Sequence, residues 1–120
     1  MKIYVSHSRH FDFKNELYDV LESSNLKHDF IFPHKESDAP FNSKELLKNK
    51  NCGLVLAEVS YPATGQGIEL GWADAYAIPV ICIYKKGSEI SGSLKVVCET
   101  FIEYEKDLVE KLRTAFEKYD

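Results

Sequence analysis

The sequence lacks the features that mark membrane-spanning, secreted and nucleic-acid-binding proteins. Its 120 residues contain no apolar run long enough to cross a bilayer, and residues 1–6 do not have the pattern of a signal peptide. Fifteen basic residues stand against nineteen acidic ones, a net charge of −4 that disfavours binding to nucleic acid or to an anionic membrane. We therefore expect a cytoplasmic protein with neither nucleic acid nor membrane among its partners.

Cysteine is also scarce. Cys52, Cys82 and Cys98 are odd in number, widely spaced and set among apolar neighbours. This spacing fits neither a disulfide framework nor a zinc site. We expect three reduced thiols in the core, and the sequence predicts no metal ligands.

The composition that is present is that of a globular protein. Hydrophobic residues make up 44% of the chain and charged residues 28%, close to the average for folded domains. A chain of this length corresponds to one domain, and folding should remove roughly two-thirds of its surface from water. The sequence is expected to form a single domain over residues 1–120.

Strand-like and helix-like segments alternate along the whole chain. Short apolar runs predict strands at residues 2–6, 29–32, 54–57, 79–84 and 96–102. Apolar residues at spacings of three and four, or a capping pattern, predict helices over residues 13–22, from 42–45 onward, 68–77 and 108–116. This order predicts an α/β fold, a Rossmann-like (flavodoxin-like) parallel sheet of about five strands with helices on both faces.

Ligands bind to such sheets beyond the carboxyl ends of the strands. The loops to consider are therefore residues 6–10, 33–41, 60–67 and 85–93.

The loop at residues 60–67 is the most informative. Gly65 and Gly67 allow positive φ angles and close approach of a ligand to the backbone. Glu69 is expected in the first turn of the helix that follows, where unpaired N–H groups favour its charged form. An ionised carboxylate suits a nucleophile, although a glutamate in a first helical turn is also common for stability alone.

Two nucleotide-binding motifs do not fit. The spacing Gly-x-Gly-x-x-x-Gly differs from the dinucleotide fingerprint and follows an internal strand, and a Walker phosphate loop is absent. The sequence therefore predicts no redox cofactor.

Three segments carry a resemblance to a known family. They are LAEVS at residues 56–60, GQGIELG at residues 65–71 and PVIC at residues 79–82. Together they resemble the nucleoside 2-deoxyribosyltransferase superfamily, and within it most closely the 2′-deoxynucleoside 5′-phosphate N-hydrolases. The resemblance implies cleavage of the N-glycosidic bond of a deoxyribonucleoside or its 5′-monophosphate, without a cofactor.

The resemblance also implies three catalytic roles. Glu69 matches the glutamate that attacks the anomeric carbon, and a carboxylate beneath the ring stabilises the positive charge of the transition state. Tyr4 matches a tyrosine whose hydroxyl supports that glutamate, although an aromatic residue on a strand is often only a core residue. Glu45 matches an aspartate that serves as the acid, but it also forms a plausible capping pair with Asn42.

Further residues are candidates for binding the substrate. His34 matches a histidine near the substrate, Ser93 matches a serine that reaches into the neighbouring subunit's site, and Arg9 suits bidentate contact with a phosphate. The full set of binding candidates is Ser6, His7, Ser8, Arg9, His34, Gly65, Gly67, Ser91 and Ser93. The resemblance therefore implies a homodimer with a shared active site, although all of these polar side chains could instead be solvated loop residues.

Several positions depart from the pattern of the hydrolases. Ala63 replaces a serine that contacts the phosphate, Trp72 replaces an arginine, and residues 6–10 lack the glycines of the first loop. These changes concern the requirement for a 5′-phosphate and leave Glu69 in place.

Other functions stay open on the sequence alone. A base-exchanging deoxyribosyltransferase would use the same nucleophile, and hydrolysis is favoured because the chain is short. The segment YVSHS at residues 4–8 also resembles the opening of Toll/interleukin-receptor domains, some of which cleave NAD. A nucleotide-binding module without catalysis is the third alternative.

Overall fold

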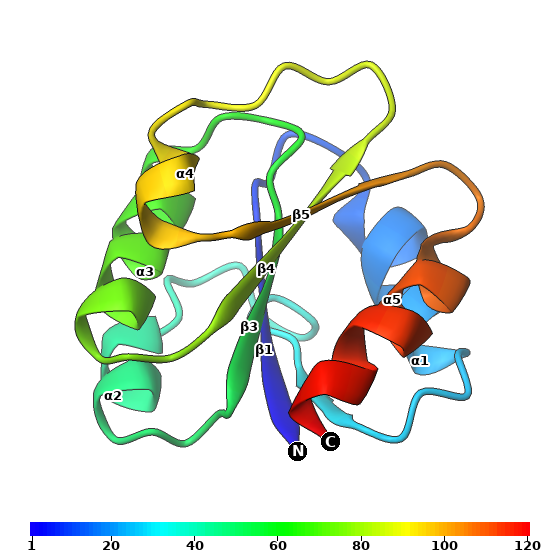
Figure 1. Ribbon diagram of the computed structural model, residues 1–120. Helices are drawn as coiled ribbons and strands as arrows, with labels where there is room; N and C mark the ends of the chain where they lie inside the picture. Colours follow the sequence, from blue (N-terminus) through cyan, green and yellow to red (C-terminus); the bar gives the residue numbers. More distant parts are fainter.

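Five parallel strands form one sheet in the order β2-β1-β3-β4-β5. The computed structural model describes residues 1–120 (Figure 1). The strands are β1 (Lys2–His7), β2 (Asp29–Ile31), β3 (Leu54–Glu58), β4 (Val80–Lys85) and β5 (Thr100–Tyr104). The expected α/β fold with an all-parallel sheet is confirmed.

Helices cover both faces of the sheet. In Figure 1, α2, α3 and α4 lie on one face, and α1 and α5 lie on the other. The helical segments are η1 (Lys14–Tyr18, a π-helix), α1 (Asp19–Glu22), α2 (Ser43–Lys48), α3 (Thr64–Ala75), α4 (Leu94–Val97), α5 (Leu108–Phe116) and the short 3₁₀ segment η2 (Glu117–Tyr119). This is the arrangement expected when right-handed crossovers join parallel strands.

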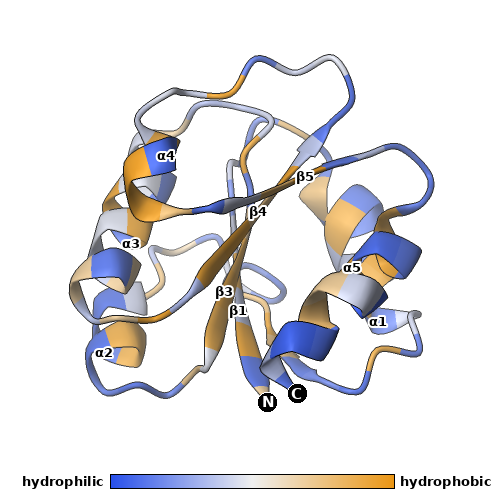
Figure 2. Ribbon diagram, in the orientation of Figure 1, coloured by the Kyte–Doolittle hydropathy of each residue, from blue (hydrophilic) through white to orange (hydrophobic).

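The central strands supply a separate core to each face. On β3, Leu54 and Leu56 belong to the cluster beneath α1 and α5, whereas Val55 and Ala57 belong to the cluster beneath α2, α3 and α4. This alternation follows from the two-residue period of a strand. Because both faces of β3 are covered, its sequence is a nearly continuous apolar run. Figure 2 shows the sheet mainly in the hydrophobic colour.

All three cysteines are buried and free, as the sequence predicts. No helix is both long enough and apolar enough to span a membrane.

The start of α3 differs from expectation. The helix begins at Thr64 instead of Ile68, so Gly65 and Gly67 have helical conformations and the only glycine with positive φ is Gly87, at 88°. Glu69 therefore lies in the second helical turn, and the prediction of a first-turn position, with its unpaired N–H groups, is wrong. Glycine weakens a helix by only about 1 kcal/mol, which the packing of Leu70 and Ala73 against the sheet overrides.

The strand expected at residues 96–102 is also shorter than expected. Leu94–Val97 forms α4, and β5 begins at Thr100. Leu94 and Val97 pack against the core cluster beneath α3. A short apolar run in a sequence is compatible with either a short helix or a strand, because both can bury it against one face of the sheet.

Candidate active site

The carboxylate of Glu69 is held by two hydroxyl groups of β1. Tyr4 Oη donates a hydrogen bond of 2.5 Å to Oε2, and Ser6 Oγ donates one of 2.8 Å to Oε1. Tyr4 and Ser6 are two residues apart on the strand, so both side chains point to the face covered by α3. Two hydroxyl groups, 65 and 63 residues before Glu69 in the sequence, thus converge on its carboxylate.

Tyr4 remains a hydrogen-bond donor throughout the ordinary pH range. Burial raises the pKa of its phenol well above the usual value, and the negative charge of Glu69 and the hydrogen bond to it raise it further. The tyrosine is almost fully buried, whereas Glu69 is only partly buried. The carboxylate therefore faces a cleft while its supporting donors stay inside the protein.

Glu69 lies in a cleft of about 600 Å³ at the carboxyl edge of the sheet. The cleft is at the ends of β1 and β3, where the strand order reverses direction, the position at which doubly wound sheets bind ligands. Its lining residues include His7, Ser8, Arg9, His10, His34, Asp38, Phe41, Ser43, Gly65, Gln66, Glu69 and Trp72. A carboxylate, a guanidinium group, histidines and aromatic rings are thus gathered in one hollow.

Arg9 and His34 form the basic side of this cleft. Arg9 Nη2 lies 3.1 Å from both ring nitrogens of His34 and donates to the backbone oxygen of Asp38 at 2.7 Å. Both side chains are accessible to solvent. An anionic group in the cleft would therefore find a guanidinium group available for contact.

His7 is fixed inside the protein as a neutral ring. Its Nδ1 lies 2.8 Å from the carbonyl oxygen of Ser8, which can only accept, so Nδ1 carries the proton. Nε2 then accepts from Tyr18 Oη at 2.6 Å, and that hydroxyl accepts from the backbone N–H of His34 at 3.1 Å. Burial lowers the pKa of His7 to about 4. His7 thus anchors the segment that carries His34.

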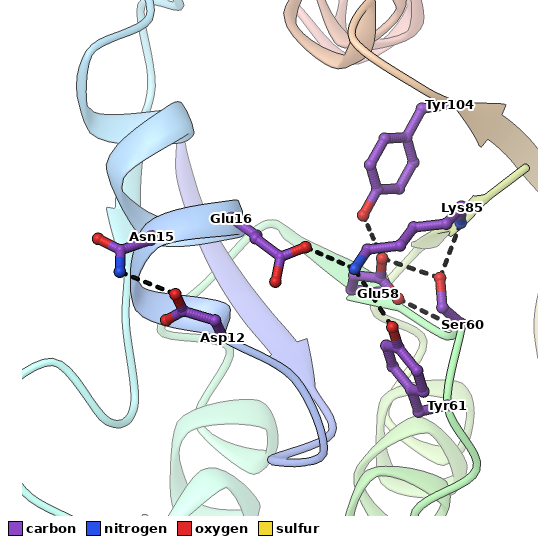
Figure 3. Close-up of polar contacts among 8 residues, drawn as sticks. All are labelled: Asp12, Asn15, Glu16, Glu58, Ser60, Tyr61, Lys85 and Tyr104. Carbon is purple, nitrogen blue, oxygen red and sulfur yellow. Dashed lines mark hydrogen bonds and ion pairs between the residues drawn. The ribbon is translucent and has the colours of Figure 1, made fainter.

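A second carboxylate has similar donors but no access to solvent. Glu58, at the end of β3, accepts from the Ser60 N–H at 2.6 Å, from Ser60 Oγ at 3.0 Å and from Tyr104 Oη (Figure 3). It is fully buried. This carboxylate can organise the end of β3 but cannot reach a ligand.

Lys85 contacts both Ser60, a partner of Glu58, and residues of the segments that follow β1 and β3. Its backbone N–H donates to Ser60 Oγ at 2.7 Å, and its Nζ contacts Glu16 at 2.6 Å and Tyr61 Oη at 3.3 Å (Figure 3). The ammonium group also lies over the rings of Phe11 and Tyr61. These contacts fix the segments that follow β1 and β3.

Other predicted site residues lie outside the Glu69 cleft. Gly67, Ser91 and Ser93 line a neighbouring hollow of about 670 Å³ on the other side of α3. This hollow shares Ala63, Thr64 and Gln66 with the Glu69 cleft. Glu45 lines neither hollow. Its backbone N–H donates to the Asn42 side chain, and its exposed carboxylate accepts from Asn49, as in the capping interpretation.

Comparison with known proteins finds one distant similarity. The chain is 33% identical over 61 residues to the protein named "Putative 2'-deoxynucleoside 5'-phosphate N-hydrolase 1" from Syntrophotalea carbinolica. The match covers 51% of this chain and 43% of that protein, so less than half of the relative's length is represented. No protein-family model matches the chain. The distant similarity agrees with the resemblance drawn from the residues.

Several lining residues were not predicted as site residues from the sequence, among them Trp72, Phe41, Ser43 and Gln66. Trp72 is three residues beyond Glu69 on α3, and this spacing places it on the same helix face. Phe41 stacks on Tyr4 with ring centroids 5.6 Å apart, while Ser43 and Gln66 are almost completely buried. The helical spacing could have identified Trp72, but no local signal brings Phe41 to Tyr4.

No group of three or more histidine, cysteine, aspartate or glutamate side chains converges in a way that could hold a metal ion.

Proposed function

We propose that this protein is an N-glycosidase that cleaves 2′-deoxynucleosides or their 5′-monophosphates through a covalent intermediate on Glu69. The observation that carries the proposal is the Glu69 carboxylate, oriented by Tyr4 and Ser6 and facing a cleft. A fixed carboxylate beneath the sugar both stabilises positive charge and can bond to the anomeric carbon. The distant similarity to a protein named as an N-hydrolase supports the same reaction class.

The reaction balances in two steps. An oxygen of Glu69 bonds to C1′ as the C1′–N bond breaks, and the electron pair of that bond leaves with the base nitrogen, which takes a proton from an acid of the cleft. Water then bonds to C1′ and releases the Glu69 carboxylate, while its proton returns to that acid. The products are the free base and the deoxyribose or deoxyribose 5-phosphate.

The rim of the cleft offers groups for the remaining roles. His10, His34 and Asp38 line it and can exchange protons with a departing base. Phe41 and Trp72 offer flat faces on which a base can stack. Arg9 would contact a 5′-phosphate, so the monophosphate is the favoured form of the substrate.

We further propose that the protein acts as a homodimer. Ser93 lines the hollow beyond α3, away from the Glu69 cleft of its own chain. In a dimer, this serine would take part in catalysis by reaching the cleft of the second copy. This is the arrangement that the family resemblance implies.

The test is base release by purified protein. The wild type is incubated with deoxynucleosides, their 5′-monophosphates, matched ribonucleotides and NAD, and the products are separated by chromatography. Glu69→Gln should lower the rate by roughly 10³-fold or more, because the amide cannot act as the nucleophile. Its thermal stability, measured in parallel, should stay close to that of the wild type.

Each result has a distinct meaning. Release of base from a deoxy substrate, lost in Glu69→Gln, supports the proposal, and transfer of the sugar to an added second base would identify a transferase. Release of nicotinamide from NAD alone would contradict the assigned substrate class. Binding of nucleotides without any release would contradict catalysis.

A further inference from the structure

Four side-chain hydrogen bonds join α3 to the sheet, and Gln66 makes two of them. Gln66 lies in the first turn of α3, and its side chain is buried. Its Nε2 donates to the backbone oxygen of Ser6 at 3.2 Å and to that of Glu58 at 2.8 Å. One amide group therefore holds the start of the helix against the ends of both β1 and β3.

Gln66 and Glu69 both contact Ser6 from the same helix. Gln66 and Glu69 are three residues apart on one helix, so they lie on the same face. Ser6 is consequently held twice by α3: its backbone oxygen accepts from Gln66, and its hydroxyl donates to Glu69. A shift of the first turn would change the distance between the Glu69 carboxylate and both of its donors.

The end of β3, to which Gln66 donates a hydrogen bond, is itself held in place. The side chain of Glu58 points to the opposite face of the sheet, where Ser60 and Tyr104 bind its carboxylate (Figure 3). Its backbone oxygen is thus a rigid acceptor for the Gln66 amide. The Gln66 side chain thus connects the residues around Glu58 with the Glu69 cleft.

We propose that Gln66 is a positioning residue that sets the geometry of the Tyr4–Glu69–Ser6 hydrogen bonds. The inference rests on the proposed function of Glu69. The two N–H groups of Gln66 Nε2 donate to the backbone oxygens of Ser6 and Glu58. An aliphatic side chain has no such donors, and an asparagine side chain is too short to reach both oxygens. Gln66 acts through Glu69 and does not itself bond to the sugar.

The first test is kinetic. Gln66→Met keeps a side chain of similar length but removes both donors. We expect kcat for base release to fall about 10- to 100-fold, because small displacements of a catalytic group are costly, while KM changes by less than about threefold. Asp74→Asn, exposed on the same helix, is the matched control and should leave both constants unchanged.

The second test does not need activity. The buried hydroxyl proton of Tyr4, bonded to Glu69, should give a downfield proton NMR signal that is absent from Tyr4→Phe. In Gln66→Met this signal should move upfield or broaden, and in Asp74→Asn it should not. A general loss of stability would not move this signal while the protein remains folded.

The outcomes separate the two proposals. Wild-type kcat and an unchanged Tyr4 signal in Gln66→Met would overturn the role of Gln66. If the wild type releases no base, the proposed function fails and the Tyr4 signal alone decides whether Gln66 positions Glu69. If Gln66→Met does not fold, Gln66→Asn provides the same two measurements with an amide that is one methylene too short.

Discussion

At the scale of single residues, His7 shows how burial assigns a role to a titratable group. The ring lies at the end of β1 between the carbonyl of Ser8 and the hydroxyl of Tyr18. Burial lowers its pKa to about 4, and in the same surroundings raises the pKa of Tyr18 to about 12. The neutral histidine therefore accepts from a protonated tyrosine, and the pair supports the backbone of His34 at the cleft.

This assignment predicts the dependence of stability on pH. The folded pKa of about 4 is below the ordinary value of 6.5, so between these values the unfolded chain binds a proton that the folded chain does not. The contribution of His7 is thus complete above pH 6.5 and declines as the pH falls to about 4, by roughly 2–3 kcal/mol. In His7→Gln, which can still accept from Tyr18 but cannot become charged, urea unfolding should show a smaller loss over this interval.

The exposed His10 provides the comparison, since His10→Gln removes an exposed imidazole ring instead of a buried one. An unchanged pH dependence in His7→Gln would show that His7 is not the buried neutral group described above.

At the scale of elements, α3 is a helix that begins earlier than its glycines indicate. Gly65, Gly67 and Gly71 all lie within it, and a Cβ atom placed on any of them would meet nothing within 4 Å. The sequence places Gly65 and Gly67 in a loop, where glycine would serve positive φ angles, and Gly71 in the helix that follows. In the structure they adopt helical angles that any residue can adopt.

The glycines of α3 should therefore be replaceable. Gly67→Ala and Gly71→Ala should each raise the free energy of unfolding by about 0.5–1 kcal/mol, because alanine loses less backbone entropy in a helix. Gly87→Ala should instead lower it by about 1–2 kcal/mol, since Gly87 has a φ of +88°. Urea unfolding measures all three, and destabilisation by Gly67→Ala would contradict the early start of α3.

At the scale of the whole molecule, two hollows lie beside α3, and Ser93 lines the one that does not contain Glu69. Glu69 and Ser93 belong to different hollows of one chain. A two-fold dimer repeats the same contact on both subunits, so each copy could complete the cleft of the other.

Mixing variants tests this arrangement. Glu69→Gln and Ser93→Ala should each show reduced base release when assayed alone. The two variants are then denatured and refolded together in equal amounts. About a quarter of the sites would combine an intact Glu69 of one chain with an intact Ser93 of the other, so about a quarter of the wild-type activity should return. The molecular mass in solution is measured by light scattering. A monomer, or no recovery on mixing, would contradict the shared site.

Much of the architecture follows from the sequence. The apolar runs at residues 54–57 and 79–84 predict central strands because a strand buried on both faces has few polar positions. The order of elements predicts the parallel sheet, and the segment GQGIELG points to Glu69 as the candidate nucleophile. These features are local, since each depends on the burial pattern of a few consecutive residues.

Only the tertiary structure decided which side chains meet. Tyr4 and Glu69 are 65 residues apart, and their hydrogen bond exists because α3 packs across the end of β1. The same packing overrides the loop preference of Gly65 and gives Gln66 its two acceptors. It leaves Glu45 and Ser93 outside the Glu69 cleft. The sequence pattern determines which faces of the helices and strands are buried. Which distant polar side chains come into contact depends on how these buried faces pack against one another.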